Sequence, residues 1–216
     1  IGALKEKNNK DKRILLSIET LKKFSKMNLT ILVGKDYGLN SNINDQELID
    51  SGASIESEEN ILKKSDIILK ISLDKDDNVS FFKEGSNIIL NNFDKTNLEI
   101  LQNFKSKNIN IFSLDFLPRI TRAQSMDILS SQANLAGYRS VIDSSYEFNK
   151  AVPMMMTAAG TVTPAKFFII GAGVAGLQAI ATAKRLGGVV SATDVRIASK
   201  EQVESLGGKF LTVEQK

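Results

Sequence analysis

The sequence predicts an α/β protein with two domains, each built around a parallel sheet. Short apolar runs of strand length alternate with longer segments in which apolar residues recur every three or four positions, a pattern typical of parallel sheets covered by helices. Near Pro118 the composition also changes. Before it the chain is rich in Lys, Asn and Ile with a net charge of −1, and after it rich in Ala, Gly, Val and Thr with a net charge of +4. We therefore expect an N-terminal α/β domain over residues 1–118, a connecting helix over 119–148 and a second domain over 149–216.

Four strands and three helices are expected in the first part of the chain. Short apolar runs of the kind that is buried inside a parallel sheet predict strands over 29–33, 67–71, 87–90 and 109–114. Apolar residues at helical spacing, or a Gly that ends the segment, predict helices over 20–27, 45–51 and 97–106. The polar, basic run 7–13 has no interleaved aromatic residues, so we expect a solvated loop there and no nucleic-acid site.

The second part of the chain begins with a long helical pattern over 121–148, which Gly137 could divide into two helices. Thr121 could cap the start of this helix. A connecting segment bracketed by Pro153 and Pro164 follows. Beyond it we expect strands over 165–170, 189–193 and 209–213, and helices over 177–186 and 199–206.

The composition excludes several kinds of chemistry, because the 216 residues contain no Cys and no His. Disulfides, thiol nucleophiles, iron–sulfur clusters and zinc sites with Cys or His ligands are excluded, and we expect no metal centre. No imidazole can act as an acid–base catalyst. No apolar run approaches the roughly 20 residues that a membrane span needs, and the first residues lack the apolar core of a signal peptide.

The most informative motif is Gly171-Ala-Gly-Val-Ala-Gly176, which has the pattern G-x-G-x-x-G and directly follows the predicted strand over 165–170. Gly171 allows a tight turn from strand to helix. Gly173 lets the backbone approach a pyrophosphate, and Gly176 lets helix and strand pack closely. Free N–H groups at the start of the next helix attract phosphates. The motif predicts a dinucleotide site, and the alternative is a glycine turn that serves packing alone.

Asp194 ends the next predicted strand, 18 positions after Gly176. A carboxylate there can accept hydrogen bonds from the hydroxyls of the adenosine ribose, and its charge repels a 2′-phosphate, which favours NAD over NADP. Two alternatives remain: Asp194 could be a cap or a solvated turn residue, and Arg196 could hold a 2′-phosphate. The order of strand, glycines, helix, strand and carboxylate favours a Rossmann-like, NAD-binding domain.

A second motif lies at the change in composition. The segment 118–139, Pro-Arg-Ile-Thr-Arg-Ala-Gln-Ser-Met-Asp-Ile-Leu-Ser-Ser-Gln-Ala-Asn-Leu-Ala-Gly-Tyr-Arg, resembles the nicotinamide-side loop and helix of proton-translocating NAD(P) transhydrogenases. Segments 157–166, 171–176 and 194–208 continue the resemblance, which is to the peripheral NAD(H)-binding component, the alpha subunit or its N-terminal portion. The start of the chain resembles the wider alanine dehydrogenase/transhydrogenase family.

The resemblance implies a role for each residue that matches a family position. The residues that would form the reaction centre are Arg119, Gln124, Asp127 and Ser130. Three of these would hold the nicotinamide carboxamide and ribose, and Gln124 would reach towards NADP(H) on a partner component. Further cofactor contacts in the same turn are Ser125, Met126 and Ile128. The residues of the pyrophosphate turn would be Gly171, Gly173, Val174 and Gly176, and those of the adenosine-ribose site Asp194, Val195 and Arg196.

The implied activity is that of a Re/Si-specific, proton-translocating transhydrogenase. A hydride would pass directly between NADH on this chain and NADP⁺ on the partner component, coupled to proton translocation. Such a transfer needs no protein acid or base at the reacting carbon, which suits a chain without His. The implied partners are a membrane-embedded, proton-translocating component, an NADP(H)-binding component and a second copy in a homodimer. The implied location is peripheral, on the cytoplasmic side of the inner membrane.

Alanine dehydrogenase is the nearest alternative enzyme. Arg13 and Lys70 lie where that family keeps the Arg and Lys that contact pyruvate, although Lys70 could simply end a strand. The family also uses a His in the region that holds Asn91-Asn92-Phe93 here, and the lack of His argues against amino-acid dehydrogenation. An NAD-binding sensor without turnover is the non-enzymatic alternative.

The second domain is expected to be truncated. A Rossmann fold has six parallel strands, and the chain offers three before Lys216. We therefore expect two Rossmann-like domains, of which the second is an incomplete dinucleotide-binding fold, and a chain that is a fragment.

Overall fold

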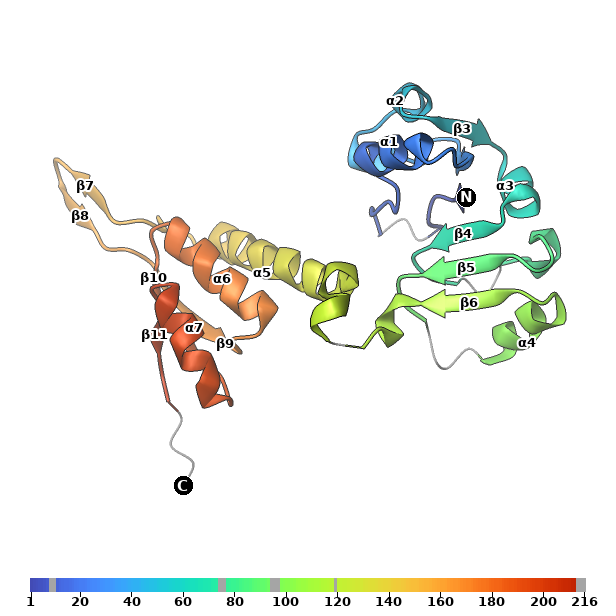
Figure 1. Ribbon diagram of the computed structural model, residues 1–216. Coiled ribbons are helices and arrows are strands. Elements are labelled where there is room, and N and C mark those ends of the chain that lie inside the picture. The colour runs from blue at the N-terminus through green and yellow to red at the C-terminus, as the bar shows by residue number, and fades with distance from the viewer. Residues whose placement is uncertain (8–10, 74–76, 94–97, 119, 213–216) are drawn as a thin grey trace. The chain divides into compact units, whose positions relative to one another are not determined.

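The computed structural model describes residues 1–7, 11–73, 77–93, 98–118 and 120–212 (Figure 1). The chain forms two compact units, Ile1–Met126 and Asp127–Lys216. Each unit is α/β and has a parallel sheet of its own, which confirms the predicted fold class.

The sheet of the first unit has six strands in the order β3-β2-β1-β4-β5-β6, and every neighbouring pair is parallel (Figure 1). The strands are β1 (Gly2–Ala3), β2 (Ile31–Gly34), β3 (Ala53–Glu56), β4 (Ile67–Lys70), β5 (Asn87–Leu90) and β6 (Asn110–Ser113). The chain builds the sheet outward from β1 to β3 and then places β4 on the other side of β1. The carboxyl ends of β1 and β4 therefore flank the point where the strand order reverses, which is where open α/β sheets bind ligands.

Among its described residues the first unit has four α-helices, and polar side chains cap the first three of them. The helices are α1 (Ile18–Lys26), α2 (Asp45–Asp50), α3 (Glu58–Lys64) and α4 (Leu98–Ser106). Ser17, Asn44 and Ser57 each accept a hydrogen bond from a backbone N–H in the first turn of α1, α2 and α3. The interior is apolar, with Tyr37 and Phe104 among its largest fully buried side chains.

The second unit is built on a sheet of three parallel strands in the order β11-β10-β9. Its strands and the helices between them are, in chain order, β9 (Lys166–Ile170), α6 (Val174–Arg185), β10 (Val189–Thr193), α7 (Lys200–Ser205) and β11 (Lys209–Phe210). Buried Ile180, Val190 and Val203 belong to one apolar cluster that joins helices and sheet. The predicted order of strands and helices is thus confirmed, with β11 shorter than expected.

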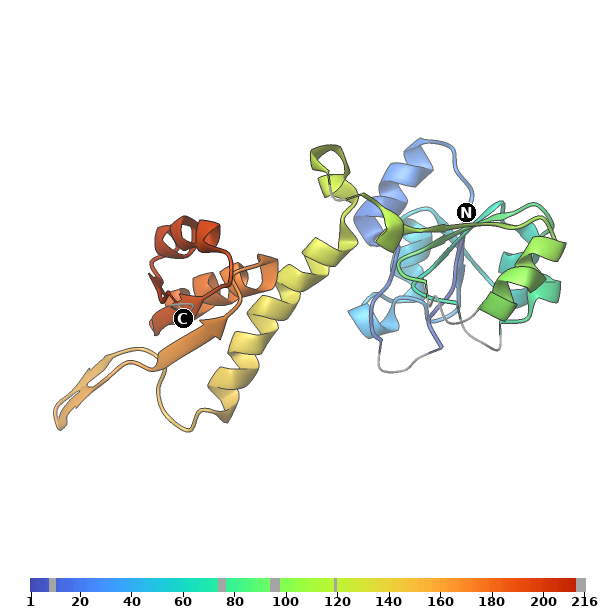
Figure 2. The same cartoon turned by 90° about the horizontal axis from the view of Figure 1, so that it is seen from below.

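The long helix α5 (Ile128–Glu147) lies alongside α6 (Figures 1 and 2). Gly137 does not divide it. A Cβ on this buried glycine would stand 2.1 Å from the carbonyl oxygen of Ala175 in α6, so Gly137 lets the two helices approach closely. The expected helix over 121–148 is wrong at its start, because Thr121–Met126 is a 3₁₀ helix.

A two-stranded antiparallel hairpin, β7 (Met155–Thr157) and β8 (Gly160–Val162), extends from the second unit (Figure 1). Sequence patterning did not predict it, since the segment has no alternation of apolar and polar residues. The two-residue β1, the short β3 and α3 were also missed. β1 has only two residues, β3 (Ala-Ser-Ile-Glu) is not a continuous apolar run, and no Gly follows α3 as Gly52 follows α2.

Candidate functional site

The turn between β9 and α6 depends on glycine at two positions. Gly171 directly follows β9 and has φ = +94°, a conformation that other residues rarely adopt. A Cβ on Gly176 would stand 1.8 Å from the carbonyl oxygen of Gly171. No side chain fits there, so Gly176 lets the first turn of α6 pack directly on the chain that leaves the strand. Gly171 therefore forms the predicted tight turn, and Gly176 allows the predicted close packing of helix and strand.

Gly173 differs from the other two glycines of the motif. It is the N-cap of α6, with φ = −78° and ψ = −169°, an extended conformation that any residue adopts. A Cβ added to it would meet no atom within 4 Å. The helix that starts here is 12 residues long, and its first N–H groups have no partners within the helix, which gives this end a partial positive charge. Val174 is exposed beside it.

Asp194 follows β10 and connects the glycine turn to the next loop. Its Oδ2 accepts a hydrogen bond from the backbone N–H of Ala172 at 2.6 Å, and its Oδ1 accepts one from the N–H of Arg196 at 2.8 Å. The guanidinium of Arg196 adds Nε to Oδ1 at 3.1 Å and Nη2 to Oδ2 at 3.2 Å. The Arg196 side chain, followed by the two backbone donors, holds the pKa of Asp194 well below its ordinary value.

These contacts change the expectation for Asp194. The carboxylate fixes the glycine turn from within the chain, a structural role beyond the expected binding of ribose. The side chain of Arg196 contacts this carboxylate. Val195 between them is 94% exposed.

The segment before α5 holds the residues expected on the nicotinamide side. Asp127 is the N-cap of α5, so the expectation that Thr121 caps this helix is wrong. Oδ1 of Asp127 accepts the N–H of Ser130 at 3.0 Å, and Oδ2 accepts the Ser130 hydroxyl at 2.6 Å. Ile128 begins the helix and is half-buried.

The other predicted residues on this side lie in the first unit. Gln124, Ser125 and Met126 are exposed residues of the 3₁₀ helix that ends at Met126. Arg119 lies outside the described residues. Within the second unit, Gly137 of α5 touches Ala175 in the first turn of α6, so the helix that starts at Asp127 also passes beside the glycine turn.

Charged side chains also gather at the carboxyl ends of β1 and β4. Lys70 is the last residue of β4. Its Nζ lies 2.5 Å from Oδ2 of Asp77, and the two side chains are 5% and 4% exposed. Nζ of Lys7 lies 3.5 Å from the other oxygen of Asp77. Lys70 therefore ends a strand, which was the alternative to a role in pyruvate binding, and it also forms an ion pair.

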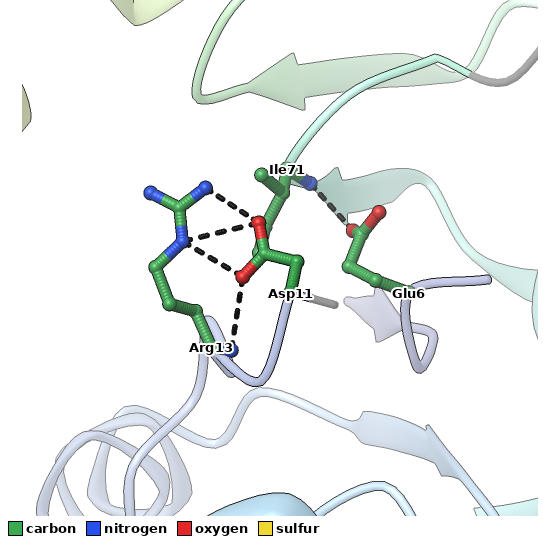
Figure 3. A network of polar contacts seen from close by, with 4 residues as sticks. All are labelled: Glu6, Asp11, Arg13 and Ile71. Atoms are coloured by element: carbon green, nitrogen blue, oxygen red, sulfur yellow. Dashed lines mark hydrogen bonds and ion pairs between the residues drawn. The ribbon is translucent and has the colours of Figure 1, made fainter. Parts of the chain in front are cut away.

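An ion pair and a hydrogen bond also lie near this end of the sheet (Figure 3). Figure 3 shows Arg13 turned towards Asp11. The Nε–Oδ1 distance is 2.9 Å and the Nη2–Oδ2 distance is 2.6 Å. The Arg13 guanidinium lowers the pKa of Asp11. Glu6 accepts the N–H of Ile71, the residue after β4, at 2.7 Å. The sequence points to Arg13 and Lys70 but not to Asp11 and Asp77, because no motif marks either carboxylate as an ion-pair partner.

Comparison with known proteins fixes the family. Residues 2–136 match the domain described as alanine dehydrogenase/PNT, N-terminal domain, and residues 140–216 match the alanine dehydrogenase/PNT, C-terminal domain. The chain belongs to the alanine dehydrogenase/PNT family. The family predicted from the sequence motifs is therefore confirmed.

Within the alanine dehydrogenase/PNT family, the chain is 47% identical to the first of the chains that make up NAD(P) transhydrogenase subunit alpha in Rhodospirillum rubrum, over 99% of its own length and 57% of that protein. The corresponding protein of Rickettsia prowazekii is 46% identical, with coverages of 99% and 57%. The crystal structure of transhydrogenase from Sinorhizobium meliloti superposes with a TM-score of 0.92 at 48% identity, over 99% of this chain and 62% of that one. The chain thus spans somewhat more than half of these relatives.

The helices were also compared with the length and apolarity that a bilayer requires. Among the residues that the structure describes, none of the helices is both long enough and apolar enough to cross a membrane.

Proposed function

We propose that this chain belongs to the NAD(H)-binding component of a proton-translocating NAD(P) transhydrogenase, with the dinucleotide bound at the turn between β9 and α6. The observation that carries the proposal is the surroundings of Gly173. Its backbone conformation and open surroundings are compatible with any residue, so packing within the chain does not require glycine there. A pyrophosphate lying against the backbone at the start of α6 does require it. The 47% identity to a transhydrogenase subunit supports the same assignment.

Each element of the second unit then has a binding task. The N–H groups in the first turn of α6, beginning with that of Val174, would donate to the pyrophosphate, and the helix dipole favours its negative charge. Gly171 and Gly176 give the turn its shape. Asp194, held by backbone donors, would accept the adenosine-ribose hydroxyls, and the exposed Val195 would lie against the adenosine.

The pair Asp127 and Ser130 suits the carboxamide of the nicotinamide. Because the Ser130 hydroxyl donates its hydrogen to Asp127, its oxygen presents lone pairs, which accept a carboxamide N–H. The resemblance to the transhydrogenases also assigns Arg119, Ser125, Met126 and Ile128 to the binding of the nicotinamide end of NAD(H). Gln124 is exposed, as a residue that reaches a nucleotide on another component has to be.

The protein's contribution to the reaction is position. The bound NADH supplies a hydride, which NADP⁺ on the partner component accepts. The chain orients the carboxamide through Ser130 and anchors the phosphates at α6, so that the two nicotinamides meet in a reactive arrangement. No side chain has to take or give a proton at the reacting carbon, which is consistent with the lack of His.

The same proposal assigns the partners. The full-length protein would dock on a membrane-embedded, proton-translocating component at the cytoplasmic side of the inner membrane, face a separate NADP(H)-binding component, and form a homodimer. The relatives whose alpha subunit is divided into more than one chain support a multi-component enzyme. Hydride transfer of Re/Si stereospecificity, coupled to proton movement, is the activity of the assembled complex.

The test is a hydride-transfer assay with the full-length protein. NADH and a chromogenic NADP⁺ analogue are mixed with the protein, with and without its NADP(H)-binding component. We expect transfer only when both components are present. Reduction of NAD⁺ by alanine without a partner would indicate a dehydrogenase, and NADH binding without either reaction would indicate a sensor. A protein that binds no NADH would contradict all three.

A substitution at Gln124 tests its predicted bridging role. In Gln124→Asn we expect the rate of transfer to the NADP⁺ analogue to fall more than the affinity for NADH, because the shortened side chain no longer reaches the partner's nucleotide. Gln102→Asn, an exposed glutamine on α4, is the control and should change neither. Equal losses of transfer and of NADH affinity in Gln124→Asn would argue against bridging.

Amino-acid dehydrogenation is the less favoured function because of the ion pairs in the first unit. The two side chains that the resemblance assigns to pyruvate binding, Arg13 and Lys70, are already paired with Asp11 and Asp77 of the same chain. A carboxylate substrate would have to displace both internal carboxylates, and the Lys70 pair is almost completely buried.

A further inference from the structure

The carboxylate of Asp194 has four hydrogen-bond donors, which fill its acceptor positions. Each carboxylate oxygen accepts about two hydrogen bonds. Oδ1 has the N–H and Nε of Arg196, at 2.8 and 3.1 Å, and Oδ2 has the N–H of Ala172 and Nη2 of Arg196, at 2.6 and 3.2 Å. A ribose therefore finds no acceptor position on Asp194 unless one of these donors leaves.

The four donors are of two kinds. Two are backbone amides, which the glycine turn and the loop after β10 hold in place. The other two belong to one side chain, Arg196, which is 62% exposed, whereas that of Asp194 is 6% exposed. A guanidinium that is largely in water can move at little cost, because an exposed ion pair contributes little free energy. The Arg196 side chain also makes one long contact, Nη2 to the carbonyl oxygen of Ala172 at 3.5 Å.

The Arg196 guanidinium has the donor arrangement of a ribose. It places one N–H on each oxygen of the carboxylate, a bidentate pairing. The 2′- and 3′-hydroxyls of a ribose lie on adjacent carbons and can likewise donate one hydrogen to each oxygen. The two groups compete for the same two positions, while the backbone donors can remain in both cases.

We propose that Arg196 is an internal competitor of the adenosine ribose, which a bound dinucleotide displaces from Asp194. This inference rests on the proposed binding of NAD(H) at the glycine turn. The backbone amides keep the carboxylate in its binding position throughout, and the guanidinium shields it until the ribose arrives. Arg196 thus lowers the affinity for every nucleotide that carries an intact ribose diol.

Calorimetric titration of the full-length protein with NADH, adenosine 5′-monophosphate and 2′-deoxyadenosine 5′-monophosphate tests the competition. In Arg196→Met, which keeps an aliphatic side chain, we expect the affinity for the first two to rise about twofold to fivefold, the value of an exposed charged pair. The deoxynucleotide needs only one of the two positions and should gain less. Arg196→Lys keeps the charge without the bidentate geometry and should lie between wild type and Arg196→Met.

Arg185→Met is the matched control, because it removes one exposed positive charge from the last turn of α6. We expect it to leave the affinities unchanged or slightly lower. Weaker or unchanged NADH binding in Arg196→Met, an equal gain for the deoxynucleotide, or an equal gain in Arg185→Met would overturn the competition and leave the NAD(H) site standing. A wild-type protein that binds neither NADH nor adenosine 5′-monophosphate would overturn the proposed function itself.

Discussion

In the first unit, charged side chains at the carboxyl ends of β1 and β4 pair with one another, whereas in the second unit the turn after β9 contains Gly171 and Gly173. Lys70 contacts Asp77, and Glu6 accepts the N–H of Ile71. At Gly173, by contrast, even an added Cβ would meet nothing. The two parallel sheets thus differ at their carboxyl ends. The first holds the buried Lys70–Asp77 pair, whereas in the second the Asp194–Arg196 pair follows β10 and the turn after β9 leaves space at Gly173. Fold alone does not decide which sheet binds.

The largest loss of stability is expected when the buried Lys70–Asp77 pair of the first unit is removed. Asp77→Ala leaves the buried ammonium of Lys70 without this carboxylate, and loss of one member of a buried pair costs about 3–5 kcal/mol. We expect the β1 and β4 amides of the full-length variant to exchange their hydrogens faster than those of wild type.

The control for Asp77→Ala is Asp66→Ala, which removes an exposed partner of Lys83 and should change little. The double variant Lys70→Met/Asp77→Leu should recover most of the stability. If Asp77→Ala is as stable as wild type, the Lys70–Asp77 pair does not stabilise the carboxyl ends of β1 and β4.

The glycine turn can be broken by adding one methyl group. Gly176→Ala forces a Cβ against the carbonyl of Gly171, and we expect a loss of about 1–3 kcal/mol in the stability of the second unit. NADH affinity should fall with it, because the turn is distorted. Gly34→Ala, whose Cβ would meet nothing closer than 4.0 Å, is the control for hydrogen exchange in both units. A stable Gly176→Ala protein would contradict the close packing of the turn.

Tyr37 tests how the segment after β1 is held. Its buried hydroxyl oxygen accepts the N–H groups of Leu15 and Leu16 at 2.8 and 2.9 Å, and burial raises its pKa to about 12. Tyr37→Phe leaves both amides unpaired, which should cost about 1–3 kcal/mol by thermal or urea unfolding. Tyr146→Phe, at an exposed tyrosine, should cost nothing measurable. Equal stabilities of the two variants would show that the hydroxyl is dispensable.

The smallest effect is expected in the unfolding free energy at acidic pH. The pKa of Asp194 is lowered by its contacts with Arg196 and Ala172, so its contribution to stability is complete above the ordinary value of 3.8 and is lost as the pH falls below it. We expect the unfolding free energy of wild type to fall more steeply below about pH 4 than that of Asp194→Asn, which has no such carboxylate. Parallel pH profiles would mean that the carboxylate does not anchor the turn.

The difference between the two sheets also explains what the sequence could predict. The spacing of the motif predicts Gly171 and Gly176, because a local turn needs glycine at both positions. The pattern of apolar residues predicts α6 and β10, because both elements are long enough for that pattern to be recognised. The pairing of Lys70 with Asp77 and the contact of Asp194 with the N–H of Ala172 join residues across loops, so they depend on tertiary structure. From the sequence alone Gly137 could divide the helical pattern into two helices, and only the close approach of α6 shows why a glycine stands there.

The most direct test of the open second site is Gly173→Ala in the full-length protein, titrated with NADH by calorimetry. A pyrophosphate that lies against this backbone leaves no room for a methyl group, so we predict a loss of affinity of roughly tenfold to a hundredfold, equivalent to about 1–3 kcal/mol. Thermal unfolding should be nearly unchanged, because the added Cβ meets no atom of the chain within 4 Å. Unchanged NADH affinity in a folded Gly173→Ala protein would contradict dinucleotide binding at this turn.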